Sequence, residues 1–109
     1  MAIIFKKGVK LSGMTTQCWA AVHVAEGCFD TEGVDTVVTS INDGKHGRGS
    51  KHYIGNAPDL RSKHLPSLAA KKRVLALLKA RLTNEFDILL EDIGEPNEHY
   101  HIEWDPKTR

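Results

Sequence analysis

Two histidine-containing segments, far apart along the chain, most constrain what this sequence can fold into. The first, residues 50–59, reads Ser-Lys-His-Tyr-Ile-Gly-Asn-Ala-Pro-Asp, and the second, residues 98–103, reads Glu-His-Tyr-His-Ile-Glu. His52, Asp59 and His101 would supply two imidazoles and one carboxylate. Catalytic zinc sites take three protein ligands of these types and keep a fourth position for water. The sequence therefore predicts a fold that brings both segments to one metal ion.

The first segment has the local chemistry that such a site needs. Gly55 permits unusual backbone angles and, like the alanine two residues later, allows the chain to approach a metal closely. His52 and Asp59 can then reach the same ion. The alternative interpretation is a set of scattered surface histidines, because the sequence has six of them. His23 and His64 are not expected to be ligands.

Length and composition limit the classes of protein. The 109 residues predict one domain, over 1–109, and the net charge of +1 gives no reason to expect binding to nucleic acid or to an anionic membrane. No apolar run reaches the roughly 18 residues that a membrane span needs, and the start of the chain does not read as a signal peptide. We therefore expect a protein that is cytoplasmic as synthesised, or one exported by other means. We also expect a monomer.

Hydrophobic patterning predicts the secondary structure. Strands are expected over 34–41, 86–90 and 99–104, and an edge strand or a tucked-in arm over 2–5. Helices are expected from Thr15 or Thr16 to about Cys28 and from Pro66 or Ser67 to near Leu82. Residues 42–59 read as loop and turn. This order predicts an α+β domain with both helices on one side of a small antiparallel sheet. Two cysteines on the first helix would lie about 15 Å apart, too far for a disulfide, so two buried free thiols are expected.

The second segment is ambiguous if it forms a regular strand, because alternate residues of a strand face opposite sides. One side would carry the side chains of His99, His101 and Glu103, and the other side those of Glu98, Tyr100 and Ile102. A regular strand thus places His99 beside His101. A bulge or turn at the start of the strand could instead bring Glu98 toward the metal. Periodicity leaves open which residue is the catalytic base.

The two segments together resemble a known family. Ser50-x-His52-x-x-Gly55-x-Ala57-x-Asp59 is similar to the signature of the zinc D-alanyl-D-alanine carboxypeptidases. That family includes D-Ala-D-Ala dipeptidases and phage endolysins that cleave L-alanyl-D-glutamate bonds, and it shares its fold with the hedgehog signalling domain. Its second element, Glu-x-x-His, resembles Glu98-x-x-His101, and the resemblance covers roughly residues 34–105. It implies a hedgehog/DD-peptidase-like fold.

The resemblance also implies roles for individual residues. His52, Asp59 and His101 would be the Zn²⁺ ligands, and Glu98 the general base that takes a proton from the attacking water. Ser50 would support the ligand geometry through hydrogen bonds.

One departure from the family pattern concerns the cation that stabilises the oxyanion. Family members commonly carry an arginine soon after the strand that precedes the first motif, whereas residues 39–46 here contain none. Arg48, a fixed cation with several donors, is the first candidate to replace it. Lys45, His46 or His99 are the other candidates.

The resemblance implies a zinc peptidase that hydrolyses peptidoglycan stem peptides, of the phage endolysin type. Such a protein would act on the cell wall after release by other lysis proteins. A D-Ala-D-Ala carboxypeptidase or dipeptidase is the nearest enzymatic alternative. A non-catalytic module, stabilised by zinc and binding the cell wall or a phage structural assembly, is an alternative from a different class.

Overall fold

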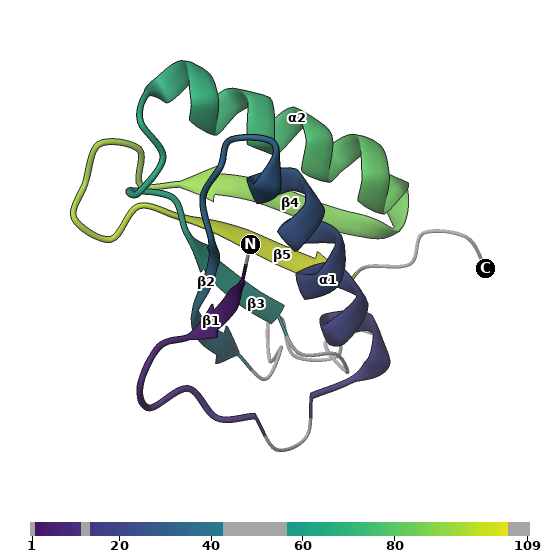
Figure 1. The fold of residues 1–109 in the computed structure, drawn as a ribbon. Helices are drawn as coiled ribbons and strands as arrows, with labels where there is room; N and C mark the ends of the chain where they lie inside the picture. Colours follow the sequence, from purple (N-terminus) through teal and green to yellow (C-terminus); the bar gives the residue numbers. More distant parts are fainter. Residues whose placement is uncertain (1, 12–13, 43–56, 105–109) are drawn as a thin grey trace.

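Two helices and five strands make up the part of the chain that the computed structural model describes, residues 2–11, 14–42 and 57–104 (Figure 1). In chain order they are β1 (Ile3–Phe5), α1 (Thr16–Asp30), β2 (Thr36–Asn42), β3 (Ala57–Arg61), α2 (Leu68–Leu82), the short 3-10 helix η1 (Thr83–Glu85), β4 (Phe86–Glu91) and β5 (His99–Trp104). None of the helices in these ranges is long and apolar enough to cross a membrane. The predicted α+β class is confirmed.

The five strands form a single mixed sheet in the order β1-β2-β3-β5-β4. The pairs β2–β3, β3–β5 and β5–β4 are antiparallel, as predicted, but β1 runs parallel to β2. The prediction of a purely antiparallel sheet is therefore wrong. The reason is that α1 connects β1 to β2, and a helical crossover returns the chain in its original direction.

Strand β3 was not predicted, because its first three residues belong to the turn-rich first segment. It nevertheless lies between β2 and β5 in the sheet. Pro58 is the second residue of the strand and pairs with Ile41 of β2. Proline has no N–H to donate, so it is tolerated near the start of a strand better than at its centre. As a consequence, Asp59 stands on a sheet strand and not on a loop.

Both helices begin where the capping residues predict. The Thr15 side chain accepts a hydrogen bond from the Cys18 N–H (3.2 Å), and the Ser67 side chain accepts one from the Ala70 N–H (3.1 Å). Each cap satisfies one of the backbone donors that a helix start leaves without a partner.

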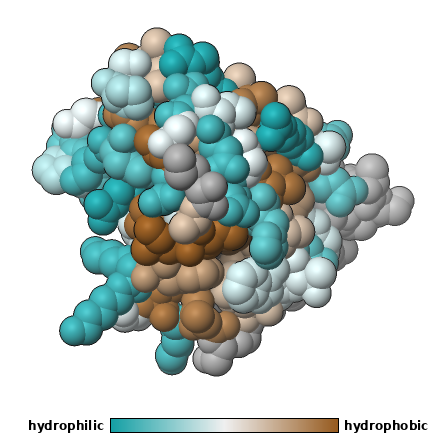
Figure 2. All heavy atoms as spheres, in the orientation of Figure 1, coloured by the Kyte–Doolittle hydropathy of each residue, from teal (hydrophilic) through white to brown (hydrophobic). Residues whose placement is uncertain are grey.

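The hydrophobic core lies between one face of the sheet and the two helices, which also contact each other (Figure 1). The sheet contributes Val38, Leu60, Ile88, Tyr100 and Ile102 to this core. On α2, the first residue, Leu68, is 46% exposed, while Ala70 and Val74 are buried. In the same orientation, Figure 2 shows hydrophobic side chains gathered below the middle of the molecule, with hydrophilic ones around them.

The two cysteines are free and buried on α1, as predicted. Burial raises the pKa of Cys18 to about 11 and also raises the pKa of Cys28. The thiolate is the reactive form, so Cys18 should react with iodoacetamide about 100-fold more slowly in the native protein than in denaturant, and Cys28 should also be slowed. Mass spectrometry of time-resolved labelling measures both rates. Fast labelling of either cysteine in the native protein would contradict this burial.

Candidate functional site

The face of the sheet opposite the helices, called the open face from here on, carries the polar residues of β3 and β5. The side chains of Asp59, His99 and His101 on it are only 15–19% exposed. Asp59 pairs with His101 across these strands, while the next pair, Leu60 and Tyr100, belongs to the core. The alternation of each strand therefore separates a packed side from a polar side. This arrangement brings Asp59 of the first segment beside His101 of the second.

Asp59 and His101 form a close pair. His101 Nδ1 lies 2.8 Å from Asp59 Oδ1, and His101 Nε2 lies 3.2 Å from Glu103 Oε1. The hydrogen bond to Asp59, reinforced by Glu103, raises the pKa of His101 to about 9 although burial opposes the shift. Burial alone would raise the pKa of Asp59, but hydrogen bonds from His101 and Ser40 outweigh it and lower that pKa.

A β-bulge in β2 directs Ser40 toward this pair. The register shifts between Val38, which pairs with Leu60, and Ser40, which pairs with Asp59. Without the shift, Val38 and Ser40 would face the same side of the sheet, because side chains alternate along a strand. With it, Ser40 Oγ donates a hydrogen bond to Asp59 Oδ2 at 2.8 Å. Ser40 thus holds the carboxylate from the side opposite His101.

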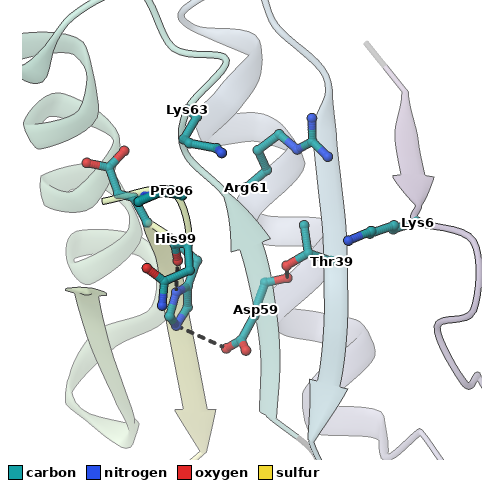
Figure 3. Close-up of a pocket in the computed structure, with 9 residues that line it drawn as sticks. Lys6, Thr39, Asp59, Arg61, Lys63, Pro96 and His99 are labelled. Atoms are coloured by element: carbon teal, nitrogen blue, oxygen red, sulfur yellow. Dashed lines mark hydrogen bonds and ion pairs between the residues drawn. The ribbon is translucent and has the colours of Figure 1, made fainter. Parts of the chain in front are cut away.

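His99 stands next to the pair on the same face. Its Nδ1 lies 2.8 Å from the Asn97 carbonyl oxygen, which can only accept, so Nδ1 carries a proton. Its Nε2 lies 3.0 Å from Glu91 Oε1 and 3.9 Å from Asp59 Oδ1. Both ring nitrogens of His99 therefore face hydrogen-bond acceptors, a backbone carbonyl on one side and a carboxylate on the other. Figure 3 shows His99 and Asp59 pointing toward one another.

Glu98 occupies the other side of β5. Its buried carboxylate accepts hydrogen bonds from Ser62 Oγ (2.7 Å) and the Gly94 N–H (3.0 Å), and it pairs with Lys71 Nζ of α2 (2.7 Å). Burial would raise the pKa of Glu98, but these three partners hold it at about 2. Tyr100 has the same orientation, since its hydroxyl donates to the Lys71 carbonyl oxygen. The pairing of β5 with both neighbours is regular, so no bulge brings Glu98 toward Asp59.

The predicted site is only partly within the described residues. His52, Ser50 and Arg48 lie in the segment 43–56, outside the described residues. Within the described ranges, no three His, Cys, Asp or Glu side chains form a group that could hold a metal ion. Asp59 and His101 carry donor atoms of the types that zinc takes, a carboxylate oxygen and an imidazole nitrogen. Their 2.8 Å separation approaches the roughly 3.3 Å between neighbouring ligands of a tetrahedral ion with bonds of about 2 Å.

A hollow of about 480 Å³ opens beside Asp59 and His99. Its wall includes three cationic side chains, Lys6, Arg61 and Lys63 (Figure 3). Sequence reasoning missed these cations as well as Ser40 and Glu91. The partnership of Glu91 with His99 could have been found from the hairpin register of β4 and β5, whereas that of Arg61 required the strand β3.

No family model, no curated protein and no solved structure matches this chain. The chemistry of the site therefore has to be inferred from its own residues.

Proposed function

We propose that this protein is a zinc-dependent peptidase that hydrolyses peptide bonds in peptidoglycan stem peptides, as phage endolysins do. The observation that carries the proposal is the 2.8 Å contact between Asp59 and His101. These residues come from two motif segments that are separated by α2 and β4, yet they meet on the open face of the sheet. A shared metal site would account for this meeting of the two motif segments.

His52, Asp59 and His101 are the proposed zinc ligands. Zinc bound there would supply a Lewis acid that polarises the scissile carbonyl and acidifies the attacking water. Ser40 orients Asp59 through its hydrogen bond, which is the role of a residue that supports a ligand. The imidazole of His101 has to lose a proton to bind zinc, so zinc affinity is expected to fall at acid pH.

Two carboxylates are candidates for the general base. The family resemblance favours Glu98, but that carboxylate is held by Ser62, Gly94 and Lys71 on the helix side. Glu91 lies on the open face, with its side chain 41% exposed and in contact with His99. A base must come within hydrogen-bond reach of the water that it deprotonates. The position of Glu91 therefore favours it as the general base. His99 and Arg48 remain the proposed donors to the oxyanion.

Mass spectrometry of purified muropeptides, after incubation with the zinc-loaded protein, tests the proposal. We expect cleavage of one peptide bond, its loss in chelator and its return with added zinc. General-base catalysis typically contributes about 10²–10⁴-fold. Glu91→Gln should lower the rate by that factor, and Asp87→Asn, an exposed acid of the same strand, should not. Cleavage that persists after complete removal of metal would contradict the proposal.

The masses of the products also distinguish the enzymatic alternatives. Release of terminal D-alanine would identify a D-Ala-D-Ala carboxypeptidase or dipeptidase. A non-catalytic module is favoured by one specific observation, the engagement of Glu98 in a buried network. One equivalent of bound zinc, with no cleavage of any muropeptide, would support that module and exclude the peptidase.

A further inference from the structure

The hollow beside Asp59 and His99 has a cationic wall built from separate segments of the chain. Lys6 follows β1, Arg61 ends β3 and Lys63 follows that strand. Figure 3 shows Arg61 extending from β3 across β2, with Lys6 beyond Thr39 and Lys63 on the other side. Among the residues that the structure describes, none of these three cations lies within ion-pair distance of a carboxylate. Their charges are therefore available to a ligand.

The backbone holds this wall in place. The Lys6 N–H donates to the Val38 carbonyl oxygen (2.9 Å), which extends the ladder between β1 and β2. Arg61 pairs with His99 across β3 and β5. Ser62, between Arg61 and Lys63, is fully buried and donates to Glu98. The three side chains thus stand on fixed backbone positions around a preformed cavity.

Asp59 and Glu98 both line the hollow, although the carboxylate of Glu98 is directed to the helix side, and both acids already have partners. Asp59 contacts His101 and Ser40, and Glu98 contacts Lys71. The hollow therefore has an excess of positive charge that these acids do not neutralise. An extended polyanion such as nucleic acid is disfavoured, because the net charge of the chain is only +1 and Asp59 would face its backbone. A single compact anion suits the space better.

We infer that this hollow is a substrate subsite, in which Arg61, Lys63 and Lys6 bind a free carboxylate of the stem peptide. The inference rests on the proposed function for the identity of the ligand. Stem peptides carry such groups at the C-terminus and at the α-carbon of the γ-linked D-glutamate. Guanidinium and carboxylate groups form paired, charge-assisted hydrogen bonds, which would fix the peptide beside His99 and Asp59. The subsite selects acidic peptides over their amides.

Calorimetric titration of the full chain with matched peptides tests this selection. The probes are L-Ala-γ-D-Glu-diaminopimelate-D-Ala, its C-terminal amide, and the same peptide with D-isoglutamine in place of D-glutamate. The titrations are run in chelator, because removal of zinc should stop hydrolysis of the peptides during the measurement. None of the three cations is a proposed zinc ligand, so the chelator should leave the subsite intact. We expect one of the two amides to bind about tenfold more weakly than the acid. The amide that loses affinity identifies the carboxylate.

Charge-removing variants assign the effect to the hollow. In the double variant Arg61→Gln/Lys63→Gln, acid and amide should bind with about equal affinity. The preference for the acid should remain in Lys72→Gln, which changes an exposed lysine of α2. Circular dichroism checks that each variant is folded, and Lys6→Gln, on an exposed position, provides a milder second variant that should lower the preference. Equal affinity of the wild-type protein for acid and both amides would overturn the inference. A preference that survives in both variants would overturn it too.

The outcomes separate this inference from the proposed function. Cleavage of muropeptides without selection of a carboxylate would support the peptidase function and refute the inferred subsite. Selection of a carboxylate without cleavage would support the subsite and refute the peptidase function.

Discussion

Glu98→Ala is expected to lower the free energy of unfolding by about 3 kcal/mol, a large share of the stability of a small domain. The substitution removes a buried carboxylate that contacts Lys71, Ser62 and Gly94. The ammonium of Lys71 and the fully buried hydroxyl of Ser62 would then lose their partner. Urea denaturation followed by circular dichroism measures the loss. Glu95→Ala, an exposed acid of the same turn, is the matched control and should change stability little.

The same network predicts how stability depends on pH. The pKa of Glu98 falls from its ordinary 4.5 to about 2 on folding. A lowered pKa stabilises the folded state above the pKa of the unfolded chain, and this stabilisation is lost as the pH falls through the folded-state pKa. The wild-type protein should therefore lose stability between pH 4.5 and about 2. Glu98→Gln should not show the part of this stability loss that comes from protonation of Glu98. An identical dependence of stability on pH in the wild-type protein and in Glu98→Gln would contradict this prediction.

Activity measurements separate this structural role of Glu98 from catalysis. A general base contributes about 10²–10⁴-fold to a rate, so a catalytic Glu98 would show that loss even where the variant is fully folded. We expect Glu98→Gln to keep most of its activity per folded molecule at low temperature. A loss of the full factor at a temperature where folding is complete would return the base to Glu98.

Loss of bound zinc from Asp59→Ala and from His101→Ala is the second large effect. Residues that merely support a ligand change metal affinity by about 10–100-fold, so removal of a direct ligand should weaken zinc binding by more than about 100-fold. His52→Ala should have the same effect. Metal content after gel filtration, measured by inductively coupled plasma mass spectrometry, should fall from one equivalent to nearly none.

Two histidines outside the proposed site provide controls. His23 is exposed on α1, beside Trp19, and His23→Ala should retain zinc. His64 stacks on Phe29 and its Nε2 lies 2.6 Å from the Asp35 carbonyl oxygen, so His64→Ala should retain zinc while lowering stability. Stoichiometric zinc in His101→Ala would refute the proposed ligand set.

Local signals predicted the elements whose stability is local. The caps at Thr15 and Ser67 gave the start of each helix, and the alternation in 99–104 gave β5 with its bounds. The parallel direction of β1 and the existence of the short strand β3 were missed, because both depend on pairing with partners distant in sequence. Turn-forming residues around Pro58 also concealed β3.

For the site, too, local patterns were predictive, whereas contacts between segments distant in sequence were not. Strand periodicity predicted that His99 and His101 share a face and that Glu98 faces away, and the structure has this arrangement. The resemblance to zinc peptidases favoured Glu98 as the base and said nothing of Glu91. The contact between Asp59 and Ser40 could not be predicted, because it depends on a bulge in β2 that no local pattern marks.

Strand β5 has a consequence for how this protein can change over evolution. Tyr100 and Ile102 face the helices, while His99, His101 and Glu103 face the open side. Substitutions at 99, 101 and 103 would therefore alter reactivity without disturbing the core. A library randomised at those three positions should yield mostly folded proteins, and one randomised at 98, 100 and 102 mostly unfolded ones. Substitutions on this side of β5 can therefore change the chemistry of the site during evolution while the protein still folds.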